Sequence, residues 1–139
     1  MRFYLDECIS YRVLDPLRAV YPDHDFLDCF HEGLKGTKDV PLFGEMRARS
    51  IDVFLTFDRS QLYNSEELAA IRGGGCHWVG FTSPKGSGKS QVARIASTLL
   101  NTTTFILDSA PPVPTAFRPK LTGREHRELF SFMEPIAAI

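Results

Sequence analysis

Short β-rich runs alternate with helical segments along most of the chain, and this alternation restricts the fold more than any other feature of the sequence. Strands are expected at residues 2–5, 25–30, 52–57, 76–81 and 102–107. Helices are expected at residues 9–20, 40–49, 64–71 and 87–100. The alternation predicts an α/β fold, a three-layer α/β/α sandwich around a mainly parallel five-stranded sheet. Its strand-to-strand connections are expected to be right-handed.

The length of 139 residues fits one domain. The predicted α/β core occupies residues 1–108. Residues 109–121 contain four of the nine prolines, which predicts an extended connector. A helix is expected at residues 122–133, within a C-terminal helix and tail that spans residues 122–139. We therefore expect a single domain over residues 1–139.

Sixteen basic and seventeen acidic residues give a net charge of −1, which excludes a strongly basic nucleic-acid coat. Any contact with RNA must therefore come from a local basic patch. No apolar stretch approaches the roughly 20 residues of a membrane span, and the N-terminal residues do not form a signal peptide. These features predict a cytoplasmic protein without a membrane partner. The three separated cysteines are expected to be buried thiols.

Carboxylates follow the predicted strands at points that a parallel sheet brings to one edge. Asp6 comes directly after the first strand, with Glu7 beside it, and Asp58 comes directly after the third. Asp39 lies at the amino end of the helix that follows the second strand. Carboxylates held close together repel one another, and a bound divalent cation commonly neutralises this repulsion. Ligands that are all oxygen atoms favour Mg²⁺ or Mn²⁺. In the alternative interpretation, Asp6 and Asp39 are helix caps and Asp58 is a turn residue.

Three segments resemble the compact PIN-like domains related to VapC-type toxins: Phe3–Ser10, Gly36–Leu42 and Leu55–Arg59. The resemblance covers residues 1–81 best. It implies a metal-dependent endoribonuclease that cleaves single-stranded RNA, often as the toxin of a toxin–antitoxin pair. A cognate antitoxin protein and a homodimer are the further partners that it implies.

Carried over residue by residue, the resemblance makes Asp6, Asp39 and Asp58 the metal ligands and places Glu7 with them in the catalytic site. Where the family commonly has a further acid, this chain has Ser60. A catalytically silent PIN-like module that binds RNA or a protein is therefore the second hypothesis. Glu45 is a candidate to compensate for the missing acid.

A glycine-containing loop at residues 83–90 lies between a predicted strand and a predicted helix, where phosphate-binding loops occur. The first glycine of a P-loop is replaced by Ser83, and Pro84 lacks an amide donor. A nucleotide-binding switch through Gly86–Ser90 is thus the third hypothesis. We favour a loop in which Lys85, Ser87 and Lys89 hold a nucleic-acid phosphate beside the carboxylates.

Overall fold

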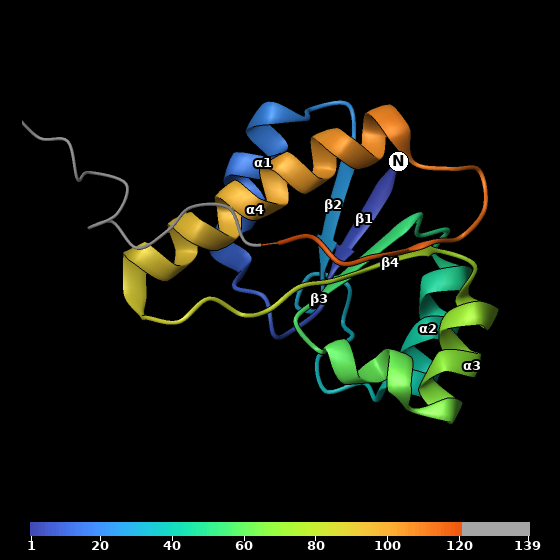
Figure 1. The fold of residues 1–139 in the computed structure, drawn as a ribbon. Coiled ribbons are helices and arrows are strands. Elements are labelled where there is room, and N and C mark those ends of the chain that lie inside the picture. The colour runs from blue at the N-terminus through green and yellow to red at the C-terminus, as the bar shows by residue number, and fades with distance from the viewer. Residues whose placement is uncertain (121–139) are drawn as a thin grey trace, which may run out of the picture.

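The computed structural model describes residues 1–120, which form a five-stranded, entirely parallel sheet flanked by helices (Figure 1). The strands are β1 (Arg2–Leu5), β2 (Asp25–Asp28), β3 (Val53–Thr56), β4 (His77–Gly80) and β5 (Ala116–Phe117), in the sheet order β2-β1-β3-β4-β5. The α-helices are α1 (Leu14–Val20), α2 (Asp39–Ala48), α3 (Ser65–Gly74) and α4 (Gly88–Ser109). Two 3₁₀ helices, η1 (Tyr11–Val13) and η2 (Arg59–Tyr63), precede α1 and α3. This arrangement confirms the predicted fold class.

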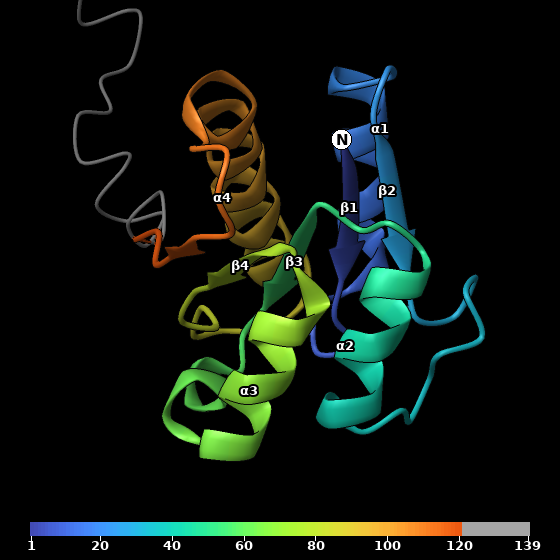
Figure 2. The same ribbon diagram turned by 90° about the vertical axis from the view of Figure 1, so that its right-hand side faces the viewer.

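The two-residue period of the strands divides the core into two halves. Phe3, Leu5 and Leu55 point to the face covered by α1 and α4. Tyr4 and Phe54 point to the opposite face, which α2 and α3 cover. Figures 1 and 2 show these helix pairs on opposite sides of the sheet. Because the central strands are buried on both faces, they contain apolar residues at nearly every position.

The predicted strand at residues 102–107 is wrong, because this segment is part of α4. Its threonines favour β structure by propensity. However, the hydroxyls of Thr98, Thr102 and Thr104 donate to carbonyl oxygens four residues earlier, at 2.9, 2.7 and 3.0 Å. The buried side of α4 has helical spacing and includes Ile95, Leu99, Thr103 and Ile106. Packing of this side against the sheet therefore outweighs the local propensity.

The fifth strand is instead β5, which lies inside the segment predicted as an extended connector. It pairs with β4 in parallel through Trp78–Ala116 and Val79–Phe117. The predicted helix at residues 122–133 lies outside the described residues. Within residues 1–120, no helix has the length and apolar character needed to cross a bilayer.

The connections do not all share one hand. The chain crosses the sheet in the same direction from β3 to β4 and from β4 to β5. It passes over the α2–α3 face in the first crossing and over the α1–α4 face in the second. Two such crossings have opposite hands, so the expectation of uniformly right-handed connections is wrong. The 22-residue helix α4 instead returns the chain to the face already occupied by α1.

Candidate functional site

The carboxyl ends of β1 and β3 form the switch point of the sheet. β1 lies between β2 and β3, and the chain leaves β1 toward β2 but leaves β3 toward β4. In parallel sheets, ligands commonly bind beyond the strand ends at such a reversal. Asp6 follows β1 directly and Asp58 lies two residues beyond β3. The topology therefore brings both predicted acids to the same end of the sheet.

Thr56, the last residue of β3, connects the two acids. Its side chain is fully buried, and its hydroxyl donates to an Asp6 carboxylate oxygen at 2.7 Å. The same hydroxyl oxygen accepts the Asp58 backbone N–H at 2.9 Å. Asp6 also accepts the Glu7 backbone N–H at 2.9 Å. Local hydrogen bonds thus fix the Asp6 carboxylate before any ligand binds.

The pKa of Asp6 is raised above its ordinary value. Burial has the largest effect, and the nearby charge of Asp39 raises the pKa further. Hydrogen bonds from Thr56, Glu7 and Cys8 act in the opposite direction but do not outweigh these effects. Asp6 therefore lies where its negative charge is disfavoured.

Two further acids, Asp39 and Glu67, come from helices α2 and α3 and lie near Asp6 and Asp58. We call these four residues the acidic edge. Asp39 is the first residue of α2, and Glu67 lies in the first turn of α3. Their carboxyl groups lie close enough for Asp39 to disfavour negative charge on Glu67. Burial first, and then the charges of Asp39 and Asp58, raise the pKa of Glu67.

Sequence reasoning missed Glu67. The segment was predicted only as a helix over residues 64–71, and Asn64 caps that helix by accepting the Glu66 and Glu67 backbone N–H groups at 3.0 and 3.1 Å. The rule that placed Asp39 at the edge applies equally to the first turn of α3, so it could have identified Glu67. The alternative interpretation of Asp39 as a helix cap is wrong, because Lys38 occupies the N-cap position of α2 and Asp39 is the first residue of the helix.

The remaining predicted acids have other partners. Glu7 accepts the Gly36 backbone N–H at 3.0 Å and so fastens the loop that leads to Asp39. Asp58 is the N-cap of η2 and accepts from both the backbone N–H and the hydroxyl of Ser60. Ser60 therefore orients Asp58. Glu45 forms an ion pair with Arg49 at 3.0 Å on its own helix, which gives it a partner other than the acidic edge.

The carboxylate oxygens of these acids are suitable ligands for a divalent cation, but the described residues do not form a complete set of ligands around one position. Within residues 1–120, no three His, Cys, Asp or Glu side chains are gathered closely enough to hold a metal ion. The acids are instead coupled in pairs, Asp6 with Asp39, and Glu67 with Asp39 and Asp58. All are hard oxygen ligands of the kind that Mg²⁺ and Mn²⁺ take, usually with several waters retained.

Cys8 lies beside the acidic edge and differs from the other cysteines. Its sulfur contacts the Asp6 carboxylate at 3.7 Å and accepts the Phe57 backbone N–H at 3.3 Å. Partial desolvation of the sulfur, and then the charge of Asp6, raise the pKa of its thiol. The residue as a whole is nevertheless exposed, whereas Cys29 and Cys76 are buried, so the prediction of three buried thiols holds only for two.

Two of the predicted phosphate-binding residues, Lys85 and Ser87, lie in the loop between β4 and α4, and Lys89 lies in the first turn of α4. Lys85, Ser87 and Lys89 are all exposed. Ser87 occupies the N-cap position of α4 but forms no side-chain cap bond there. Gly86 and Gly88 have φ angles of +104° and +64°, which only glycine adopts without strain. The loop conformation therefore depends on its glycines.

Comparison with known proteins identified no relative: no family model, curated protein or solved structure matches the chain.

Proposed function

We propose that the protein is a metal-dependent endoribonuclease that cleaves single-stranded RNA, with Asp6, Asp39, Asp58 and Glu67 as its acidic site. The observation that carries the proposal is the Thr56 hydroxyl at the switch point of the sheet, which donates to the Asp6 carboxylate at 2.7 Å and accepts the Asp58 backbone N–H at 2.9 Å. Asp39 and Glu67 lie near enough to these acids for their charges to interact. Carboxylates gathered in this way repel one another, and a divalent cation relieves that repulsion.

Each residue has a distinct task in this proposal. Asp6, held by the Thr56 hydroxyl, and Asp39, fixed at the start of α2, would be ligands of Mg²⁺ or Mn²⁺. Glu67 would join them as a further acidic ligand. A bound ion would supply a water of lowered pKa and neutralise charge on the phosphate oxygens. Glu7, through its hydrogen bond to Gly36, holds the loop that carries Asp39 in position.

Cleavage of a labelled single-stranded RNA tests the proposal directly. The wild-type protein is expected to cleave with Mn²⁺ or Mg²⁺ and to stop when a chelator is added. Asp6→Asn and Asp39→Asn are expected to abolish cleavage. Asp23→Asn, an exposed acid just before β2, is the matched control and should cleave normally. RNA binding without cleavage in the wild type would instead support the catalytically silent module.

We extend the proposal to a cytoplasmic toxin of a toxin–antitoxin pair, in which an antitoxin protein inhibits the nuclease. Its support is the resemblance of the segments around Asp6, Asp39 and Asp58 to VapC-related domains. Induced expression in bacterial cells is expected to arrest growth, and Asp39→Asn is expected to remove the arrest. Arrest that persists in soluble Asp39→Asn protein would contradict this role.

A further inference from the structure

Two adjoining hollows flank the short edge strand β5. One has a volume of about 390 Å³ and lies at the carboxyl end of β4, and the other, of about 340 Å³, lies between β5 and α4. The residues after the strand line both hollows: Arg118, Pro119 and Lys120. Neither hollow includes the acidic residues, so they constitute a surface separate from the candidate catalytic site.

The larger hollow is basic, and we name it the cationic hollow. Arg59, Arg118 and Lys120 line it together with Gly80 and Thr82. The Arg59 guanidinium donates to the Thr82 hydroxyl at 3.1 Å, which holds its charge at the end of β4. Among residues 1–120, none of the three basic side chains forms an ion pair with a carboxylate. Positive charge around a concave surface favours an anion.

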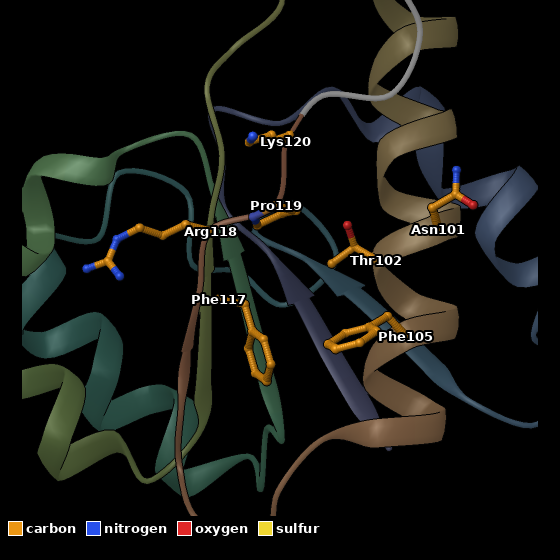
Figure 3. A pocket seen from close by; sticks show the side chains of 7 residues that line it. All are labelled: Asn101, Thr102, Phe105, Phe117, Arg118, Pro119 and Lys120. Atoms are coloured by element: carbon orange, nitrogen blue, oxygen red, sulfur yellow. The ribbon is translucent and has the colours of Figure 1, made fainter.

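The smaller hollow is aromatic, and we name it the aromatic hollow. Phe105 on α4 is 57% exposed, which is unusual for such a large apolar ring. Its ring meets that of Phe117 edge-on, with the centroids 6.3 Å apart. Figure 3 shows these two rings on one side, while Arg118 extends away from them. An exposed ring beside a cationic surface is the combination that binds the bases and backbone of a single strand.

The position of the cationic hollow connects it with the acidic edge. Arg59 directly follows Asp58 in the chain, and Gly80 ends β4, the strand next to β3. A strand with a phosphate in this hollow would therefore lie beside the carboxylates. A chain with a net charge of −1 has no global field to hold RNA, so a local patch has to supply the attraction.

We propose that the two hollows bind one single-stranded RNA, with backbone phosphates in the cationic hollow and a base stacked on Phe105 in the aromatic hollow. The inference rests on the proposed function for the identity of the ligand. It extends that function by assigning a substrate-binding surface on the β4–β5 side of the sheet. The surface holds RNA whether or not a metal ion is present, because no acidic residue belongs to it.

Binding of a fluorescent 12-nucleotide oligouridylate, followed by anisotropy in excess chelator, tests this surface without cleavage. Arg118→Ala/Lys120→Ala removes two basic side chains from the cationic hollow. The dissociation constant is expected to rise about tenfold, and the slope of log affinity against log salt is expected to fall by about 1.4, at roughly 0.7 for each phosphate contact. Phe105→Ala is expected to weaken binding about fivefold or more, by removing one stacked base.

Arg12→Ala/Arg72→Ala is the matched control, because it removes the same charge from exposed residues of η1 and α3. It should bind the RNA as the wild type does. Wild-type affinity and salt slope in Arg118→Ala/Lys120→Ala would overturn the proposal, as would an equal loss in the control. Equally tight, Arg118-dependent binding of the matching deoxyoligonucleotide would overturn the assignment to RNA. Loss of binding in these variants, in a protein that never cleaves, would refute the nuclease and leave this surface standing.

Discussion

Replacement of Thr56 by valine tests whether its hydroxyl organises the acidic edge. Valine keeps nearly the same shape in a fully buried position, so the change isolates the hydroxyl. The variant loses the bond to the Asp6 carboxylate at 2.7 Å and the acceptor for the Asp58 N–H. A hydrogen bond to a charged group contributes about 1.5–3 kcal/mol and a neutral one about 1 kcal/mol. Because solvent reaches part of the site, we expect a net loss of about 2–3 kcal/mol in the free energy of unfolding.

The same substitution is expected to raise the pKa of Asp6 still further, since the Thr56 hydroxyl stabilises its charged form. Urea unfolding at pH 7 measures the stability, and carboxyl carbon chemical shifts measured against pH report the pKa. Thr56→Ser is the matched control, because it keeps the hydroxyl and should leave the Asp6 pKa close to that of the wild type. An unchanged Asp6 pKa and an unchanged urea midpoint in Thr56→Val would refute the organising role of this hydroxyl.

Three further predictions concern the surroundings of the site. Glu67→Gln removes an acid whose pKa is raised in the folded state. The stability that this group contributes to the wild type is present below its unfolded pKa and is lost as pH rises through its folded pKa. The variant should therefore have a higher urea midpoint than the wild type at pH 7, and this difference should shrink at low pH. A Cβ at Gly80 would lie 1.9 Å from the Trp78 ring, so Gly80→Ala should destabilise the fold by about 1–3 kcal/mol. Thermal unfolding measures this loss, and a melting temperature equal to that of the wild type would contradict the packing of Trp78 against Gly80. Cys8 should react with iodoacetamide before Cys29 and Cys76, because it alone of the three is exposed. Asp6→Asn should accelerate the reaction of Cys8 by lowering the pKa of its thiol, and mass spectrometry of the labelled peptides measures the rate. An unchanged rate would mean that Asp6 does not raise the pKa of this thiol.

The sheet was largely predictable because its buried strands are short, apolar and separated by clear helical segments. The strand at 102–107 was mispredicted because three threonines of α4 satisfy their hydroxyls within the helix, which propensity does not reveal. β5 has only two residues, so no periodic pattern could mark it. Its place in the sheet comes from pairing with β4, which is a tertiary interaction.

The acidic edge was predictable in position but not in composition. Strand ends located Asp6 and Asp58, and the helix start located Asp39. The contact of Glu67 with Asp39 depends on how α3 packs against α2, which a single sequence does not specify. Ser60 stands where an acid was looked for by resemblance, and its hydroxyl and backbone N–H instead donate to Asp58. Glu67 therefore takes the role of additional acid in our proposal.

A calorimetric titration with Mn²⁺ tests most directly whether these carboxylates bind a cation. The wild-type protein is expected to bind Mn²⁺, because the cation relieves the repulsion among these carboxylates. Asp39→Asn should abolish binding, and Asp23→Asn should bind as the wild type does. Heats that are absent in the wild type, or identical in Asp39→Asn, would contradict a metal site at this edge.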